Sequence, residues 1–339
     1  MTSAALTTSP PARPSMALRW LSALVVAALL IALPFAVRAA GYESFTGLAT
    51  QVLIYGIAAL SLNLILGYGG MVSFGHAAFF GVGAYTVGIL YYHLADDSLF
   101  LGFIPGTDAM LITVPAAMIL AGLVAAIIGA FSLRTGGVQF IMITLAFAQM
   151  LFFLFVSLDT YGGDDGLIMR RRDVLPFLDT RDPTTFYYLC LGAAALWLLL
   201  TSCIVRSRFG FVLNGMRQNE QRMAATGFAP YPYKLVAFII AGMGAGLAGA
   251  LMANYLRFAS PDMLHWTKSG ELMMMVILGG AGTLLGPLLG AGALVVLESV
   301  LAAYTENWQL PLGIILLLIV LFSHGGLVAL IRRFVPEKS

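Results

Sequence analysis

The chain alternates between long apolar segments and short polar ones. A helix that crosses a bilayer needs about 20 mostly apolar residues. Soluble domains carry about 25% charged residues, whereas this chain is 60% hydrophobic and only 10% charged. The pattern predicts an all-α, polytopic integral membrane protein with about ten membrane segments, including broken or re-entrant helices. The apolar segments lie near 18–39, 46–66, 72–92, 109–132, 138–158, 185–205, 235–256, 271–283, 285–303 and 309–331.

The two ends of the chain differ from this apolar body. Residues 1–16 are rich in Ser, Thr, Pro and Ala, which predicts a disordered tail, and residues 333–339 form a second short tail. We assign 17–332 to one transmembrane domain. The first apolar run, 20–37, precedes small residues and could be a cleaved signal peptide. It is longer than the 7–15 residues typical of that element, so we predict a retained helix.

Lys and Arg in short loops predict the orientation, because cytoplasmic loops are enriched in them. The N-terminal tail, the turn at Arg134, residues 206–234 and the C-terminus carry such residues, so both termini are predicted to be cytoplasmic. Loop 93–108 contains acidic residues without Lys or Arg and is predicted to be external. Loop 159–183 contains four arginines and conflicts with the rule. We keep it external because it lies one helix from Arg134 and one from Arg206.

Glycine-rich interruptions occur in two of the apolar segments. The run Gly279-Gly-Ala-Gly282 divides 271–303 into two pieces, and this break returns the C-terminus to the cytoplasm. Ile65-Leu-Gly-Tyr-Gly-Gly70 is similar to 277–282 at a constant offset, and Gly75 and Gly81 align with Gly286 and Gly292 after a one-residue deletion. Paired glycine interruptions in the two halves of a chain point to a transport pathway. Coincidence in a chain with 37 glycines is the alternative.

The most polar internal segment, 206–234, carries five positive charges and one carboxylate, Glu220. A helix over 212–227 would place one stripe of mostly apolar residues on a single face. Such a helix is suited to a groove on a cytoplasmic partner, where Glu220 could pair with a partner cation. A surface helix resting on the membrane interface is the alternative. The stripe consists of Val212, Met216, Glu220, Met223, Ala224 and Gly227.

Sequence features of enzymes and of self-powered carriers are missing. The four histidines lack metal-ligand spacing, and there is no phosphate-binding loop of the Gly-x-x-x-x-Gly-Lys-Ser/Thr type. We therefore expect no catalytic residue, cofactor or metal in this chain. Net charge is +2 and no polybasic tract occurs, so nucleic acid is not an expected ligand. Ionisable groups within the spans are few, and we interpret Glu271 and Glu298 as structural. Energy is expected to come from another subunit.

Several motifs in order along 45–331 give this chain a family resemblance. It resembles the inner-membrane permease of branched-chain amino-acid ABC importers, of the M-type. The resemblance implies a bacterial inner-membrane protein that works with a second related permease, two cytoplasmic ATPases that use ATP, and a periplasmic substrate-binding protein. The matching motifs are Gly67-Tyr-Gly-Gly-Met-Val-Ser-Phe-Gly-His-Ala-Ala78, Gly136-Gly-Val-Gln-Phe140, Thr144-Leu-Ala-Phe147, Gly162-Gly-Asp-Asp-Gly-Leu167, Arg217-Gln-Asn-Glu-Gln-Arg-Met-Ala-Ala-Thr-Gly227, Tyr233-Lys-Leu-Val-Ala-Phe238, Ala245-Gly-Leu-Ala-Gly-Ala250 and Leu278-Gly-Gly-Ala-Gly-Thr-Leu-Leu-Gly-Pro287.

The resemblance also assigns candidate sites within the segment 206–234 and the glycine breaks. A cytoplasmic loop helix of such importers docks on the ATPase, which makes residues 206–234 the coupling loop. Asn63 and Gln149 are interpreted as structural. The coupling candidates are Arg217, Asn219, Glu220, Ala224 and Gly227; the pathway candidates are Gly67, Gly70, Ser73, Gly75, His76, Gly279, Gly282 and Gly286.

The function implied by the resemblance is translocation of branched-chain or similar hydrophobic amino acids by an ATP-driven importer. This chain would be the transport subunit and not an enzyme. One alternative is an ABC permease for urea, short amides or aromatic acids. The alternative from another class is an ion-coupled secondary carrier.

Overall fold

A computed structural model describes residues 30–35, 44–100, 102, 104–176, 178–305, 307–322 and 326–329. Seven of the helices in this part of the chain are long and apolar enough to cross a membrane. The protein is therefore an all-α, multi-pass membrane protein. The tails predicted at 1–16 and 333–339 lie outside the described residues, as does most of the first apolar segment.

Most helix boundaries agree with the predicted apolar segments to within a few residues. Helix α2 runs directly into a π-helical turn, and α10 and α12 are too short to span alone. The main helices are α2 (Ser44–Asn63) with its π-turn (Leu64–Tyr68), α3 (His76–Ala95), α4 (Met110–Ser132), α5 (Val138–Val156), α6 (Pro183–Arg206), α7 (Arg208–Gln218), α8 (Glu220–Ala225), α9 (Pro230–Leu256), α10 (Trp266–Gly279), α11 (Gly286–Tyr304) and α12 (Gln309–Phe322).

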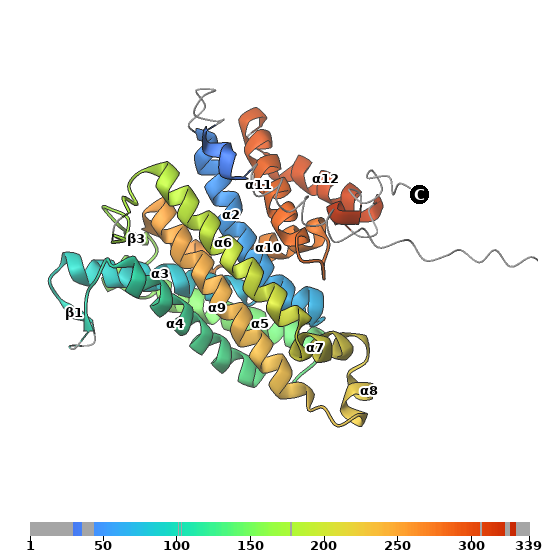
Figure 1. The fold of residues 1–339 in the computed structure, drawn as a ribbon. Coiled ribbons are helices and arrows are strands. Elements are labelled where there is room, and N and C mark those ends of the chain that lie inside the picture. Colours follow the sequence, from blue (N-terminus) through green and yellow to red (C-terminus); the bar gives the residue numbers. More distant parts are fainter. Residues whose placement is uncertain are drawn as a thin grey trace, which may run out of the picture.

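Helix α9 forms the centre of the bundle and packs against α2, α3 and α4 (Figure 1). Its Gly- and Ala-rich sequence allows this, because small residues let helix backbones approach closely within a membrane. A Cβ on Gly249 would collide with the Phe80 carbonyl of α3. One on Gly246 would lie 2.9 Å from the Ala117 carbonyl of α4. The close crossings fix α2, α3, α4 and α9 as one rigid unit.

The predicted break in 271–303 is confirmed, because α10 and α11 form a tight antiparallel hairpin. Gly279 lies against the backbone of Gly286, and Gly290 lies against the Met275 carbonyl, with no room for a side chain at any of these contacts. Gly280 and Gly282 in the connection have positive φ values of 116° and 79°. Glycine adopts this backbone conformation without the steric cost that a Cβ would add.

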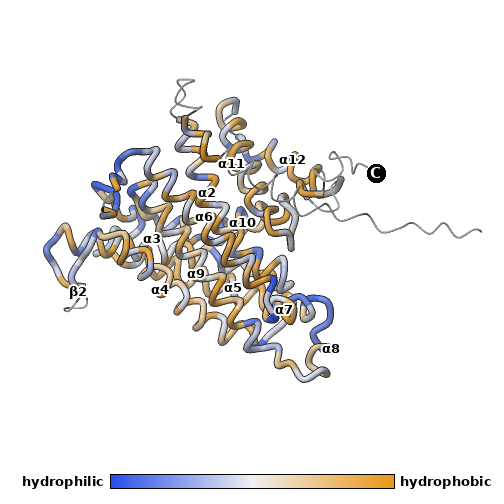
Figure 2. The backbone as a smooth tube through the Cα atoms, viewed as in Figure 1, coloured by the Kyte–Doolittle hydropathy of each residue, from blue (hydrophilic) through white to orange (hydrophobic). Residues whose placement is uncertain are grey.

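Polar residues gather at two opposite ends of the bundle (Figure 2). We call one the α8 end; it contains α7, α8 and the turn around Gly136. We call the other the β3 end, where strand β3 (Leu167–Ile168) pairs antiparallel with β4 (Phe258–Ala259). A second pair of two-residue strands, β1 (Leu99–Phe100) and β2 (Ile104–Pro105), closes the loop after α3. The helices between these ends are apolar, as expected for the membrane-spanning part.

Two predicted helices differ from the structure. The segment predicted to begin at 72 becomes helical only at His76, which leaves 69–75 as an irregular connection after the π-turn. The single helix predicted over 212–227 is wrong, because Asn219 interrupts it with extended backbone angles, φ −160° and ψ 102°. The predicted stripe is therefore divided between α7 and α8.

Candidate functional site

Asn219 forms the elbow between α7 and α8. Its backbone N–H donates to the Gly215 carbonyl at the end of α7. Its side-chain oxygen accepts from the Arg222 N–H at 2.9 Å and so caps the start of α8. An Asn at this position satisfies a helix N–H that would otherwise lack a partner. The structure thus gives Asn219 a shaping role in the segment predicted to couple to an ATPase.

The short helix α8 folds back on α7 and on the start of α9. Met223 packs on Gly215, where a Cβ would lie 2.8 Å from the Met223 sulfur. The Glu220 carboxylate pairs with Lys234 of α9 at 2.5 Å, and half of the Glu220 side chain stays exposed. Gly227, with φ +93°, turns the chain after the helix, as predicted. Ala224 and Gly227 are exposed and lie on the surface of the elbow.

Val212 and Met216, the first residues of the predicted stripe, are buried, with 6% and 4% of their surfaces exposed. Helix α7 therefore uses its apolar side to pack on its own bundle. The outer side of α7, α8 with the loop after it, and the turn around Gly136 are exposed at this end of the molecule.

The two glycine breaks meet next to the end of α7. A Cβ on Gly67, in the π-turn after α2, would collide with the backbone nitrogen of Gly282. Asn63 joins the breaks with two hydrogen bonds: its Nδ2 donates to the Thr283 carbonyl at 2.9 Å, and its Oδ1 accepts from the Gly282 N–H at 2.9 Å. We call Asn63, Gly67, Arg217, Gly282 and Thr283 the glycine junction.

Arg217 connects the glycine junction to the coupling segment. Its Nη1 donates a hydrogen bond to the Gly67 carbonyl. A Cβ on Gly282 would lie 2.9 Å from Arg217 Nη1, and a Cβ on Gly70 would lie 3.0 Å from Arg217 Cγ. Gly70 and Gly282 both have positive φ, 68° and 79°, and they occupy equivalent positions in the two similar motifs. At this one pair of positions the internal similarity corresponds to a positive φ in both motifs.

A cavity of about 500 Å³ opens at the α8 end beside the junction. The connection after α2, the turn after α4 and the elbow between α7 and α8 line it. It therefore brings four of the predicted residues, Gly70, Arg217, Asn219 and Glu220, to one place. The remaining pathway candidates lie deeper in the bundle.

Ser73 and His76 are fully buried at the start of α3. Ser73 Oγ accepts from the Gly75 N–H at 3.1 Å, which is a local structural bond. The His76 ring packs edge-on against Phe79 with 5.6 Å between the ring centroids. Within the described part of the chain, neither ring nitrogen forms a hydrogen bond. Gly75 lies in ordinary contact with Thr144 of α5.

Hydrogen bonds that the sequence analysis did not predict hold this start of α3 in place. Ser269 of α10 accepts from the Ala77 N–H at 2.8 Å and donates to the Phe74 carbonyl at 2.7 Å. Thr144 accepts from the Phe74 N–H at 3.3 Å. These bonds join residues about 70 and 190 positions apart, so no local pattern could reveal them.

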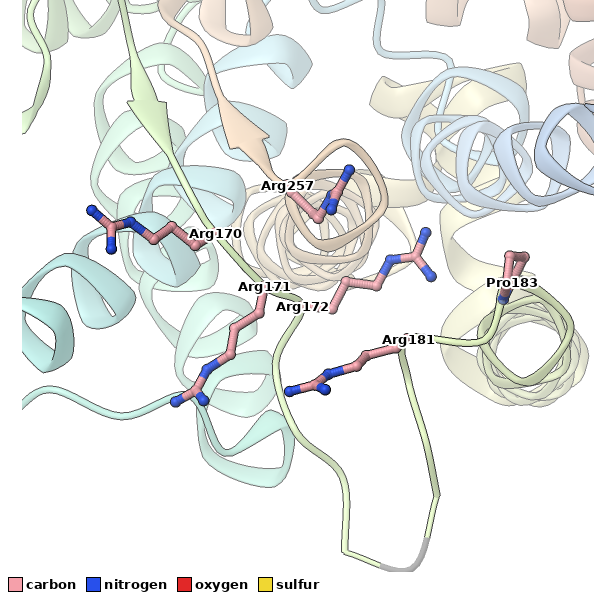
Figure 3. A pocket seen from close by; sticks show the side chains of 6 residues that line it. All are labelled: Arg170, Arg171, Arg172, Arg181, Pro183 and Arg257. Atoms are coloured by element: carbon pink, nitrogen blue, oxygen red, sulfur yellow. The ribbon is translucent and has the colours of Figure 1, made fainter.

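At the β3 end, arginines surround a second cavity of about 490 Å³ (Figure 3). We call it the arginine basin; Arg170, Arg171, Arg172, Arg181, Pro183 and Arg257 line it. Arg171 pairs with Asp108 at 2.9 Å. The Cζ atom of Arg172 lies 4.5 Å from the centroid of the Phe186 ring, and Nη1 of Arg172 donates to the Thr180 carbonyl at 3.0 Å. Burial lowers the pKa of Arg172, and the positive charge of Arg257 lowers it further.

A buried carboxyl group, Asp173, anchors the loop that carries the basin. Its Oδ2 accepts from the Thr113 hydroxyl at 2.5 Å and from Asn254 Nδ2 at 3.3 Å. Its carbonyl accepts from the Thr180 hydroxyl at 2.7 Å. Burial raises the pKa of Asp173 to about 6, while the hydrogen bonds from Thr113 and Asn254 act in the opposite direction. The loop is therefore tied to both α4 and α9.

Comparisons with known proteins agree with this architecture. The family model described as the permease component of the branched-chain amino acid transport system matches residues 44–322. The chain is similar to the high-affinity branched-chain amino acid transport system permease protein LivM of Salmonella typhimurium, with 28% identity covering 94% of this chain and 77% of the relative. LivM of Escherichia coli is 27% identical over 92% of this chain and 75% of its own.

A more distant organism provides a third relative. The probable branched-chain amino acid transport permease protein LivM of Methanocaldococcus jannaschii is 27% identical, covering 84% of this chain and 91% of the relative. No solved structure matches the chain. Because the family model extends over most of the chain and includes every described spanning helix, the chain belongs to the family of branched-chain amino acid transport system permease components.

Proposed function

We propose that this chain is the translocating subunit of an ATP-driven importer for branched-chain or similar hydrophobic amino acids. Its relatives carry names of branched-chain amino acid permeases and cover most of its length. In the proposed assembly it pairs with a second related permease, receives substrate from a periplasmic binding protein and is driven by two ATPases. ATP is used by those partners, and the chain itself binds no cofactor.

In this proposal the α8 end faces the cytoplasm and both chain termini lie on that side. Helix α8 and the loop ending at Gly227 are part of the exposed surface there, and we assign ATPase docking to Ala224, Gly227 and the exposed part of the elbow. Glu220 and Asn219 act differently: one ties α8 to Lys234 and the other shapes the elbow.

The observation that carries the proposal is the hydrogen bond from Arg217 to the Gly67 carbonyl within the glycine junction. A movement imposed on α8 and α7 by an ATPase would reach Gly67 directly through the Arg217 guanidinium. Gly67 in turn contacts Gly282, and Asn63 bridges the two breaks. Broken helices with glycines at their interruptions mark the pathway in other transporters. We infer that Arg217, Gly67, Gly70, Gly279, Gly282 and Gly286 transmit the motion that opens the path.

The test is leucine uptake by the purified complex in sealed vesicles, with binding protein outside and ATP inside. The proposal expects uptake that requires ATP and all four partner subunits. Uptake driven by an ion gradient with the ATPases omitted would instead identify a secondary carrier. Uptake of urea, amides or aromatic acids in place of leucine would identify the other permease class.

A further inference from the structure

Four ionisable side chains from three helices meet inside the membrane-spanning part of the molecule. Lys268 of α10 pairs with Glu271 at 2.7 Å, and its Nζ lies 3.5 Å from the Tyr55 hydroxyl of α2. The ammonium also lies 5.7 Å from the centroid of the Tyr55 ring. Glu298 of α11 is half-buried, and α11 packs against both α10 and α2. We call these four residues the intramembrane cluster.

The cluster lies near the middle of the membrane. At about 1.5 Å per residue, Tyr55 lies roughly 16 Å from the first residue of α2 and Glu298 roughly 9 Å from the last residue of α11. The apolar core of a bilayer is about 30 Å thick. Helix α10 therefore begins deep in the membrane and not at its surface. This position is consistent with the bonds that join Ser269 to the buried start of α3.

Charged groups at this depth carry a free-energy cost and mark pathways or functional sites in membrane proteins. The side chains of Lys268 and Glu271 are 29% and 32% exposed, so the cluster is not sealed within the core. Met274, one turn further along α10, is 38% exposed, and Val296 of α11 is 45% exposed. The charged groups thus open onto an apolar surface. A second subunit, and not lipid, is the cover that such groups tolerate.

Among the described residues, one N–H donor and one carboxylate of the cluster have no partner. An ammonium group has three N–H donors, and Lys268 directs one to Glu271 and one to Tyr55. Within the described residues, Glu298 forms no ion pair or side-chain hydrogen bond. An amino acid carries one carboxylate and one ammonium group a few ångströms apart. The free donor and the free carboxylate of the cluster are complementary in charge to these two groups.

We propose that the intramembrane cluster binds the charged ends of a free amino acid as it crosses the membrane. Lys268 and Tyr55 receive the carboxylate, Glu298 and Glu271 receive the ammonium group, and the apolar surface around Met274 accommodates the aliphatic side chain. This inference rests on the proposed function and names its substrate contacts. It also replaces the structural role that the sequence suggested for Glu271 and Glu298.

The experiment measures ATP-dependent leucine uptake by the complete complex carrying Glu298→Gln or Lys268→Met. Loss of one charge-assisted contact corresponds to a decrease of about tenfold or more. Complex yield and ATP hydrolysis stimulated by the loaded binding protein should stay near wild type. Ser299→Ala is the matched control, because Ser299 is the next residue on α11 and bonds only to the Val295 carbonyl of its own helix. It should not change uptake.

A charge-swapped variant, Lys268→Glu with Glu271→Lys, separates substrate binding from a structural ion pair. The swap preserves the pair, so the complex should assemble, but uptake should remain at least about tenfold low because the order of charges is reversed. Uptake restored by the swap, unchanged uptake in Glu298→Gln, or failure of Glu298→Gln to assemble would each overturn the proposal. A wild-type complex without ATP-dependent leucine uptake would overturn the proposed function instead.

Discussion

Arginines at the two ends of the bundle are used in opposite ways. At the α8 end, the single arginine of the glycine junction, Arg217, bonds to the backbone of one break and touches the other. At the β3 end, five arginines surround a cavity, and only Arg171 forms an ion pair among the described residues. A charge that bonds internally contributes to the moving or folded structure. A charge without such a bond is available to groups from outside.

This difference predicts where substitutions should have large effects. Around Arg217 a side chain added at Gly70 or Gly282 would meet the Arg217 side chain and would require a positive φ. Around the basin most side chains reach into a cavity, so a change removes charge without disturbing packing. The following predictions test this contrast in order of decreasing effect.

The largest effect is expected for leucine at the two left-handed glycines. Gly70→Leu and Gly282→Leu place a side chain against Arg217 and require a positive φ that residues with a Cβ rarely adopt. Both should abolish uptake. Gly192→Leu is the control, because a Cβ at Gly192 of α6 meets no atom within 4 Å. Uptake is measured relative to the amount of assembled complex. Normal uptake in either junction variant would contradict the role of the breaks.

A smaller but still large effect is expected for Arg217→Ala. Removing the bond to Gly67 should separate ATP hydrolysis from transport: uptake should fall about tenfold or more, which corresponds to one lost charge-assisted contact. Hydrolysis and complex yield should be retained. Arg208→Ala, at the opposite end of the same helix, should leave the ratio of transported leucine to hydrolysed ATP unchanged. An unchanged ratio in Arg217→Ala would show that the contact is only structural.

Sequence patterns were sufficient for the helices but not for the contacts between them. Apolar length predicted the spans because a membrane requires them, and the break at 279–282 followed from its glycines and from loop charge. Gly227 was correctly placed at the turn after the helix. The break at Asn219 was missed, because a stripe of residues continues across it and only the side-chain cap reveals the elbow.

The sequence predicted only part of the candidate site, because local patterns do not reveal contacts between distant segments. The similar motifs around Gly70 and Gly282 predicted paired interruptions of the apolar segments. Their meeting, however, depends on Asn63 and on residues about 220 positions apart. Arg217 was predicted as a coupling residue, but no local pattern revealed that its guanidinium bonds to Gly67. Lys268 and Tyr55 come together across about 213 positions, so the intramembrane cluster has no signature along the chain.

At the β3 end, Asp173 predicts a pH-dependent effect on stability. The pKa of Asp173 is raised to about 6, from an ordinary value near 4, so the folded state binds the proton more tightly than the unfolded chain. The contribution of this proton to the free energy of unfolding is therefore fully present below about pH 4 and is lost as the pH rises to about 6. Asp173→Asn should remove this dependence. The test measures the midpoint of thermal unfolding of the wild type and of Asp173→Asn from pH 4 to 7. The difference between the two midpoints should change with pH below about 6 and stay constant above it. A constant difference would contradict the shift.

The smallest effects are expected for arginine substitutions in the basin, where the loss of unfolding free energy should decrease from Arg172 to Arg171 to Arg181. Arg172→Gln loses the contact with Phe186 and the bond to Thr180, together about 1–2 kcal/mol of unfolding free energy. Arg171→Gln loses an exposed pair with Asp108, about 0–1 kcal/mol. Arg181→Gln, whose guanidinium forms no ion pair among the described residues, should change stability by no more than about 0.5 kcal/mol. Thermal unfolding of the three variants in one buffer would measure this order. A larger loss for Arg181 than for Arg172 would show that the free arginines, and not the engaged ones, hold the β3 end together.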